Sequence, residues 1–284
     1  MDYTEMQREI FRLKKECPAI GVQIFGQSTL GRRLYALQLG KGPNQILFAG
    51  AFHGMEHITS RLLLQFVADL CREGKTPRCR LTVAPMINPD GVEIQHYGWR
   101  RAGCYGSLVK RITDGDTARW QANGRGVDLN HNFDADWHDL RQREIKAGII
   151  GPAATRFGGY YPESERESHA LATFCRNQRF SMALSFHTQG EEIYWEYGDC
   201  TPSISYDIAS CMARVSGYAV SSPEGLAAGG GFKDWFIQCF QRPGFTIEAG
   251  KGQNPLPEKD FDEIYSHLRP LMEQALSCCC AMNG

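Results

Sequence analysis

A histidine and a glutamate stand three residues apart where an apolar segment gives way to an amphipathic one. These are His53 and Glu56, in the stretch FAGAFHGMEHITSRLLLQF at residues 48–66. Side chains three apart at the start of a helix have Cβ atoms about 5–6 Å apart, so one metal ion could bind both. An isolated HxxE pair also arises by chance, because polar residues gather where strands end. A third ligand must decide between these interpretations.

Two more polar residues lie at the ends of apolar segments that predict buried strands. His187 follows SMALSF, and Glu248 lies within GFTIEAG. The carboxyl ends of strands in an open α/β sheet form the edge where ligands bind, so these side chains could meet the first pair there. Two imidazoles and one carboxylate are a ligand set of catalytic zinc, which keeps a fourth position for water. Taken alone, His187 could instead be a hydrogen-bonded histidine at the end of a strand.

Glu248 is the candidate for the catalytic base. In an HExxH helix the glutamate is the base, whereas here Glu56 would be a ligand, so the base must come from another part of the chain. A carboxylate in an otherwise apolar strand is costly to bury unless something pairs with it. The position of Glu248 therefore favours a functional role over a structural one.

Apolar runs and helical periods alternate along the whole chain. Strands are predicted at residues 21–25, 32–40, 44–52, 79–87, 181–186, 191–197 and 244–250, and helices at 1–20, 57–72, 163–176, 203–217, 232–240 and 258–280. This alternation predicts an α/β fold with a mainly parallel sheet, in a single domain over residues 1–284. Between Val92 and Asn130 the pattern gives way to Gly, Arg, Asn and Asp, so we expect a long surface loop that belongs to a site.

Bulk composition argues against several classes of partner. The 31 basic and 32 acidic side chains nearly cancel, so neither a nucleic-acid nor a membrane-surface footprint is expected. No stretch of about 18 apolar residues predicts a membrane span, and residues 1–20 lack the uninterrupted apolar segment of a secretory signal. The 11 cysteines show no CxxC spacing. A reduced, cytoplasmic chain is therefore expected, and no protein partner is predicted.

Six segments, in order along the chain, resemble the motifs of the zinc carboxypeptidase family. They are FGQSTLGRRLYALQLG, FHGMEHITS, PMINPDGVE, GVDLNHNFD, SFHTQG and GFTIEAG, spread over residues 25–250. Six ordered motifs are a far more specific signal than any one of them. The resemblance implies a mixed, twisted sheet of about eight strands packed between helices. It also implies a peptidase that uses one zinc ion (Zn2+) per chain.

The resemblance implies a role for each candidate residue. His53, Glu56 and His187 match the zinc ligands of the family, and Glu248 matches its general acid/base. Asn130 matches the asparagine that holds the substrate's carboxylate. We therefore expect the hydrolysis of an amide bond.

Three positions depart from the family pattern. His131 stands where an arginine normally follows the asparagine, Gln121 where an arginine polarises the scissile carbonyl, and Leu226 where a mobile tyrosine lies. These replacements favour a subgroup that binds something other than an ordinary C-terminal α-carboxylate, with His131 and Gln121 as candidate contacts. One arginine of the same loop, such as Arg125, could restore a positive charge. The loop arginines are Arg100, Arg101, Arg119 and Arg125.

Within the family, the chain is similar to the bacterial γ-D-glutamyl-L-diamino acid endopeptidases. The shared segments are SFHTQGEEIYW and FKDWFIQCFQRPGFTIEAGKGQNPLP, at residues 185–195 and 232–257. This similarity implies cleavage of the γ-D-glutamyl–L-diamino acid (meso-diaminopimelate) bond in peptidoglycan stem peptides. Lys233 falls where pancreatic-type relatives select the side chain of the released residue, so it would favour an acidic or zwitterionic group. The alternative is an exposed lysine at the start of a helix.

Two other functions stay open. The chain could be another zinc amidohydrolase of the same superfamily, a deglutamylase or an acyl-amino-acid deacylase, although such enzymes are not expected to share the segment at 185–195. It could also be an inactive relic that binds muropeptides, as the replaced arginines and tyrosine would allow. The intact metal set and Glu248 favour an enzyme, because decay of a site normally reaches the metal and the base first.

Overall fold

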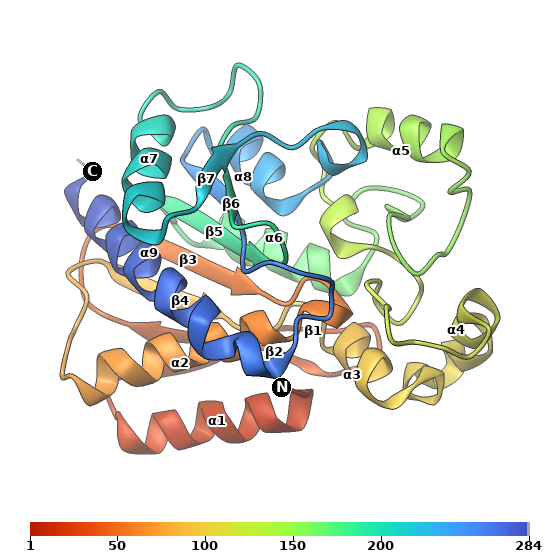
Figure 1. Ribbon diagram of the computed structural model, residues 1–284, viewed down its shortest axis with the longest axis horizontal. Coiled ribbons are helices and arrows are strands. Elements are labelled where there is room, and N and C mark those ends of the chain that lie inside the picture. Colours follow the sequence, from red (N-terminus) through yellow and green to blue (C-terminus); the bar gives the residue numbers. More distant parts are fainter. Residues whose placement is uncertain (283–284) are drawn as a thin grey trace.

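The chain folds into one mixed sheet with helices on both faces (Figure 1). The computed structural model describes residues 1–282. In this part of the chain the strands are β1 (Gly21–Gln27), β2 (Arg33–Leu39), β3 (Gln45–Gly50), β4 (Arg80–Ala84), β5 (Met182–His187), β6 (Glu192–Tyr194), β7 (Ala219–Ser221) and β8 (Gly244–Glu248). The α-helices are α1 (Tyr3–Glu16), α2 (Ile58–Arg72), α3 (Pro89–Tyr97), α4 (Gly106–Thr113), α5 (Trp137–Lys146), α6 (Arg166–Asn177), α7 (Ser205–Ser216), α8 (Phe232–Phe240) and α9 (Phe261–Ala281). Among the short 3-10 turns, η1 (Gly54–Glu56) and η3 (Leu129–His131) carry site residues.

The sheet has the strand order β1-β2-β4-β3-β5-β8-β6-β7. The central strands β4, β3, β5 and β8 run parallel, whereas β1–β2, β2–β4 and β8–β6 pair antiparallel. The ends of the central strands therefore meet at one edge, where Gly50 lies opposite Phe186 and His187 opposite Glu248. The predicted α/β fold with a mixed, mainly parallel sheet of eight strands is confirmed over residues 1–282.

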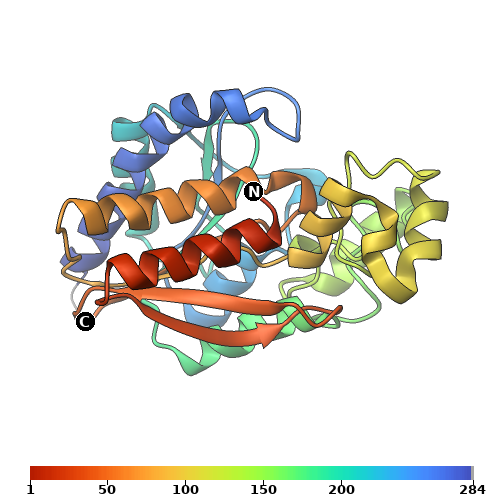
Figure 2. The same ribbon diagram turned by 90° about the horizontal axis from the view of Figure 1, so that it is seen from below.

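Two apolar layers join the helices to the sheet. On one face, α1, α2, α7 and α9 share a core with the strands that includes Leu63 and Leu268. On the other face, α6 and α8 contribute Leu171 and Trp235 to a second core. Each fully buried Leu, Ile or Phe contributes about 1.5–3 kcal/mol, so both layers hold the strand ends in place. Figure 2, seen from below, shows α1 alongside α2 and next to the hairpin of β1 and β2.

The segment 92–130 differs from the predicted long surface loop. Its first part forms α3 and α4, joined by the 3-10 turn η2 (Trp99–Tyr105), around a small apolar core that includes Trp120. Asn88 caps α3 by accepting a hydrogen bond from Gly91 N–H, so NPDG starts a helix. The loop prediction is wrong here because glycines with positive φ interrupt these helices and leave each too short to show a period. The structure also adds α5 and β7, which the sequence did not predict.

Candidate active site

The turn after β3 places His53 at the edge of the sheet. Ala51 has a φ of 47°, a left-handed conformation that is uncommon for a non-glycine residue and that directs the chain out of the strand. Gly54 has to be small, because an added Cβ would lie 2.4 Å from the carbonyl oxygen of Gly91. The Gly54 N–H donates to the carbonyl oxygen of Gln121 at 2.9 Å. The backbone is therefore fixed on both sides of His53.

Glu56 in η1 and His187 at the end of β5 form a cluster with His53. Their ligand atoms all lie within 4.8 Å of one another, and all three residues are buried. Glu56 Oε1 is 2.9 Å from His53 Nδ1, and Glu56 Oε2 is 3.1 Å from His187 Nδ1. The fold thus brings together the two imidazoles and the carboxylate that the sequence singled out.

This cluster fits a zinc ion. The nitrogens His53 Nδ1 and His187 Nε2 are buried, and neither makes a hydrogen bond within residues 1–282. This holds for His53 Nδ1 although Glu56 Oε1 lies close to it. Buried polar atoms of this kind are costly unless a ligand satisfies them. Two imidazoles and one carboxylate also leave one position open in the tetrahedral geometry of catalytic zinc. These three residues could therefore hold the metal.

Asp128, just before η3, holds the outer side of the His53 ring. The Nε2–H group of His53 donates to Asp128 Oδ1 at 3.1 Å. Burial opposes the charged form of His53, yet the Glu56 and Asp128 carboxylates outweigh it and raise the pKa of His53 well above its ordinary value. Burial also opposes the charged form of Asp128, but His53 holds its pKa far below the ordinary value. A carboxylate behind a histidine ligand fixes the ring's orientation and tautomer.

The charge states of Glu56 and His187 suit metal binding. Burial would raise the pKa of Glu56, but His53 and His187 lower it to about 2. At His187 burial dominates and lowers the pKa. Glu56 is therefore ionised and His187 is neutral at neutral pH, which are the forms in which these side chains bind a metal.

Glu248 ends β8 beside the cluster. Its Cα pairs with that of His187 on β5, and its side chain lines the same cavity. Burial, and then the nearby Glu56 carboxylate, raise the pKa of Glu248 well above its ordinary value. A carboxylate whose affinity for protons is increased in this way can take up and release a proton during a reaction.

The cluster opens into a cavity of about 130 Å³. Three of the predicted substrate-binding residues line this cavity, namely Asn130, His131 and Lys233. The other residues that line it are His53, His187, Tyr194, Pro223, Ala227, Gly231, Asp234, Thr246 and Glu248. The cavity therefore joins the metal cluster to charged and polar groups that could recognise a substrate.

Lys233 is a buried charge of the cavity, with 4% of its surface exposed. Its Nζ donates to the carbonyl oxygen of Glu196 and pairs with Asp234, which also lines the cavity. The alternative of an exposed lysine at a helix start is therefore wrong. Burying an ion pair costs solvation that the pairing itself barely offsets, so this pair is not expected to add much stability.

Asn130 and His131 each use one polar atom of the side chain for a contact within the protein. Asn130 Oδ1 accepts from Phe232 N–H at 3.0 Å, which leaves its side-chain NH2 group for a ligand. His131 Nδ1 lies 2.8 Å from Glu144 Oε1, which leaves Nε2. One amide and one imidazole thus face the cavity together.

Gln121 and Arg125 have other contacts. The carbonyl oxygen of Gln121 accepts from Gly54 N–H and from the Asn88 side chain. Arg125 Nη1 lies 3.6 Å from Glu165 Oε1. Neither is among the described residues that line the cavity. Their role in substrate binding stays a prediction.

Four polar residues of the site are absent from those that the sequence predicted: Asp128, Tyr194, Asp234 and Thr246. Tyr194 and Thr246 pair across β6 and β8, so both lie on one wall of the cavity. Alternate residues of a strand share a face, and Thr246 is two positions before Glu248, which could have indicated it. Asp128 stands between two buried apolar residues in GVDLN, a pattern similar to the one that identified Glu248.

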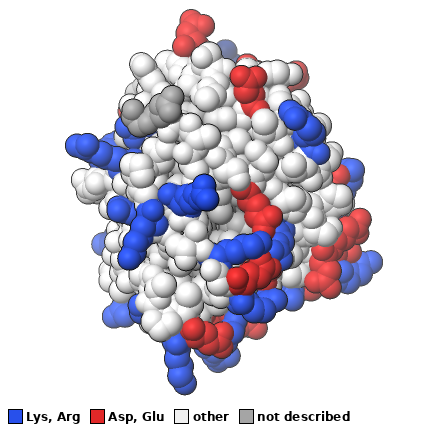
Figure 3. Space-filling view, turned by 90° about the vertical axis from the view of Figure 1, so that its left-hand side faces the viewer, with Lys and Arg blue, Asp and Glu red and all other residues white. Residues whose placement is uncertain are grey.

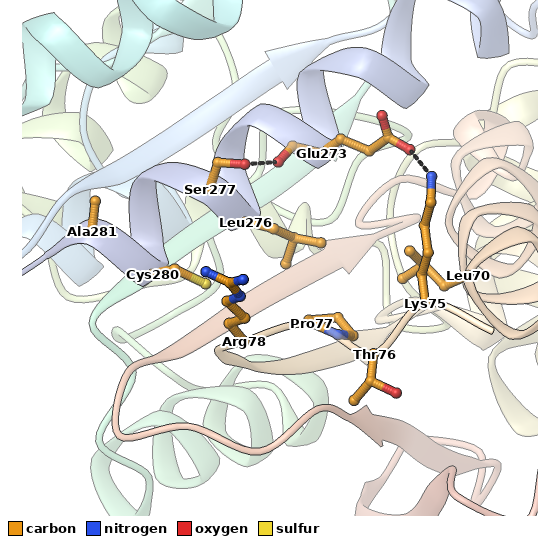
Figure 4. A pocket seen from close by; sticks show the side chains of 10 residues that line it. All are labelled: Leu70, Lys75, Thr76, Pro77, Arg78, Glu273, Leu276, Ser277, Cys280 and Ala281. Carbon is orange, nitrogen blue, oxygen red and sulfur yellow. Dashed lines mark hydrogen bonds and ion pairs between the residues drawn. The ribbon is translucent and has the colours of Figure 1, made fainter. Parts of the chain in front are cut away.

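A larger hollow of about 670 Å³ lies apart from the site, between α9 and the segment that joins α2 to β4 (Figure 4). Leu70 and Leu276 form apolar lining, and Lys75 Nζ lies 3.8 Å from Glu273 Oε1. Within residues 1–282 it contains no cluster able to hold a metal ion. This hollow is therefore not a candidate active site.

Charged side chains of both signs are mixed on one face of the molecule. On the face drawn in Figure 3, basic and acidic side chains are interspersed. Of the helices that the structure describes, none combines the length and the apolar character that crossing a bilayer requires.

Known proteins resemble this chain in sequence and in fold. A model of the zinc carboxypeptidase family matches residues 6–270. Gamma-D-glutamyl-L-diamino acid endopeptidase 1 of Lysinibacillus sphaericus is 33% identical over 280 residues, covering 93% of this chain and 69% of the relative. The structure of bovine thrombin-activatable fibrinolysis inhibitor with a tick carboxypeptidase inhibitor is similar with a TM-score of 0.79 and 21% identity, covering 98% of this chain and 97% of that one. A murein-tripeptide amidase from Escherichia coli O157 has a TM-score of 0.57 and 21% identity, covering 93% of each chain.

Proposed function

The chain belongs to the zinc carboxypeptidase family, and we propose that it hydrolyses the amide bond between γ-D-glutamate and meso-diaminopimelate in peptidoglycan-derived peptides. The observation that carries this proposal is the cavity beside the metal cluster, which contains a buried lysine. The names of two similar proteins, an endopeptidase for γ-D-glutamyl-L-diamino acid bonds and a murein-tripeptide amidase, support the same class of substrate.

In the proposed mechanism, His53, Glu56 and His187 hold the metal and Glu248 moves the proton. When bound there, zinc supplies Lewis acidity and makes water a competent nucleophile near neutral pH. Glu248 takes a proton from the attacking water and delivers it to the nitrogen of the leaving amine, so that the C–N bond breaks as the acid is formed. Glu56 does not compete for this proton, because it is already ionised and would be a ligand of the metal.

The polar groups of the cavity would bind the diamino acid. Asn130 and His131 would contact a carboxylate of the substrate, since an amide NH2 group and an imidazole are left for a ligand there. Lys233 would contact the distal carboxylate of meso-diaminopimelate, and Asp234 is close enough to Lys233 to meet the distal ammonium group. This arrangement accounts for a cavity that contains charges of both signs.

The proposal is tested with purified protein and the tripeptide L-Ala-γ-D-Glu-meso-diaminopimelate. Mass spectrometry should detect L-Ala-D-Glu and free meso-diaminopimelate when the protein holds one zinc ion, and a chelator should abolish their release until zinc is added back. The isomer with an α-linked glutamate is the matched control and should be cleaved far more slowly.

Three results would contradict this substrate. Equal cleavage of the α-linked isomer would show that the γ-linkage is not recognised. Release of glutamate branches or of acyl groups, without release of the diamino acid, would favour a deglutamylase or a deacylase. A zinc-loaded protein that binds the tripeptide but cleaves no amide would be an inactive relic.

A further inference from the structure

One ring nitrogen of His131 is held by a buried carboxylate. His131 Nδ1 lies 2.8 Å from Oε1 of Glu144 on α5, and Glu144 is 0% exposed. The other oxygen, Glu144 Oε2, accepts from Arg141 Nη1–H and from the Gly158 N–H group, the latter at 3.1 Å. Both of these partners can only donate. The carboxylate is therefore fixed in place before any ligand binds.

The contact with Glu144 decides which nitrogen of His131 carries a proton. An ionised carboxylate only accepts hydrogen bonds, so Nδ1 must be the donor. In the neutral ring, Nε2 then has a lone pair and no hydrogen, and Nε2 is the nitrogen left for a ligand in the cavity. A lone pair repels a carboxylate. Only the doubly protonated ring offers the cavity a charged N–H donor at Nε2.

We propose that Glu144 is a positioning residue that makes His131 bind a substrate carboxylate only in its protonated form. The proposal rests on the proposed function, in which a free carboxylate lies next to the scissile amide. An arginine at this position would stay charged at every working pH, whereas an imidazole can lose its charge. Preference for a free carboxylate should therefore decrease as the pH rises.

Other charged groups around His131 act on the same equilibrium. On α5 they are Glu144 and Arg141, and Asp128 precedes His131 on its own segment. Across the cavity they are His53, His187, Lys233, Asp234 and Glu248. Because several of these groups also titrate during catalysis, the rate itself cannot report on His131. The ratio of kcat/KM for two substrates that share the same catalytic steps removes the effect of these other groups.

The surroundings of Glu144 make Glu144→Gln a sharp test. Arg141 and the Gly158 N–H group only donate, so the amide oxygen of the new glutamine must face them. Its NH2 group then faces His131 Nδ1 and donates to it. This reverses the tautomer, and the neutral ring now carries its hydrogen on Nε2, toward the cavity. The variant should bind a carboxylate through a neutral donor at all pH values.

The kinetic experiment compares the tripeptide with a free C-terminal carboxylate and the same tripeptide capped as a carboxamide. For the zinc-loaded protein, the acid-to-amide ratio of kcat/KM should fall at least about tenfold between about pH 5.5 and 8.5, because one proton is bound with each carboxylate. Most of the change should lie in KM. His131→Arg and Glu144→Gln should both give flat ratios, and the exposed His138→Gln on α5 should keep the wild-type profile.

Nuclear magnetic resonance gives a readout that needs neither zinc nor turnover. In 15N-labelled protein at high pH, the His131 hydrogen should be on Nδ1 in the wild type and on Nε2 in Glu144→Gln. A wild-type ratio that is flat with pH, or an Nε2–H tautomer in the wild type, would overturn the inference. Failure to cleave either tripeptide would instead contradict the proposed function. The role of Glu144 would still be decided by two measurements, namely the tautomer of His131 and the binding affinity of the Glu248→Gln variant for the two peptides.

Discussion

Replacing Asp128 should weaken zinc binding, moderately when asparagine replaces it and more strongly when alanine does. Asp128 is proposed to support the ligand His53 and not to bind the metal itself. Its Oδ1 accepts from His53 Nε2–H and Asn130 N–H, both at 3.1 Å, and its Oδ2 accepts from Arg156 N–H at 2.8 Å. All three partners are donors. Asparagine has only one accepting oxygen, so in Asp128→Asn the donors on one side of this side chain must lose their hydrogen bonds.

The contacts determine which orientation Asp128→Asn adopts. With its oxygen toward His53, the side chain keeps two hydrogen bonds and places its NH2 group against Arg156 N–H. The reverse orientation would lose two hydrogen bonds, so we expect the first one. The Arg156 N–H group then loses its acceptor, and a typical hydrogen bond contributes about 0.5–1.5 kcal/mol, so the free energy of unfolding should fall by about this amount in the metal-free protein. His53 keeps its hydrogen-bond acceptor but loses the negative charge behind it.

The loss of zinc affinity follows from the same contacts. Removing the partner of a histidine ligand lowers metal affinity by about 10–100-fold, which is about 1.4–2.8 kcal/mol. Asp128→Asn keeps a neutral acceptor for His53, so its zinc affinity should fall by about tenfold. Asp128→Ala removes all three hydrogen bonds, so its zinc affinity should fall by about 100-fold.

Zinc affinity is measured by competition with a chromophoric chelator, and stability by urea unfolding of the metal-free protein. Asp139→Asn, an exposed change on α5, is the matched control and should leave both values unchanged. The reasoning would be refuted if Asp128→Ala bound zinc as tightly as the wild type, or if both Asp128 variants lost the same affinity.

Three further changes test other parts of the site and the fold. Glu248→Gln should retain one zinc ion per chain by metal analysis while kcat falls at least about 10²-fold, the lower bound for loss of a general base; a smaller loss would mean that Glu248 is not the base. Lys233→Met should lower the ratio of kcat/KM for diaminopimelate over lysine peptides about tenfold, because a charged hydrogen bond contributes about 1.5–3 kcal/mol; the exposed Lys259→Met should leave this ratio unchanged. Burial, and then the Asp90 carboxylate, raise the pKa of Glu167 from 4.5 to about 8. The folded state therefore keeps a proton that the unfolded chain loses, so the free energy of unfolding should decrease as the pH rises between these two values. Glu167→Gln should flatten this decrease in urea midpoints at different pH, and an unchanged slope would contradict the assignment.

The sequence by itself determined the class of fold and singled out the residues that meet at the sheet edge. The apolar runs that end at His187 and Glu248 indicated buried strands, and a buried parallel strand can be recognised from its own residues because both faces are apolar. The spacing of His53 and Glu56 follows from the local geometry of the chain. These features depend on residues close together in sequence, which is why they could be predicted before any contact between distant segments was known.

Only the tertiary structure decided which groups from distant segments support these residues, and which predicted residues lie outside the cavity. Asp128 lies behind His53, and Glu144 lies behind His131, because separate segments fold against the sheet edge. Lys233 is buried because α8 packs on the sheet, and Arg125 points to Glu165 instead of the cavity. A side chain's sequence position does not fix its partner when that partner comes from another loop. The orientation of each polar group depends on packing and on hydrogen bonds that form only when the whole core is assembled.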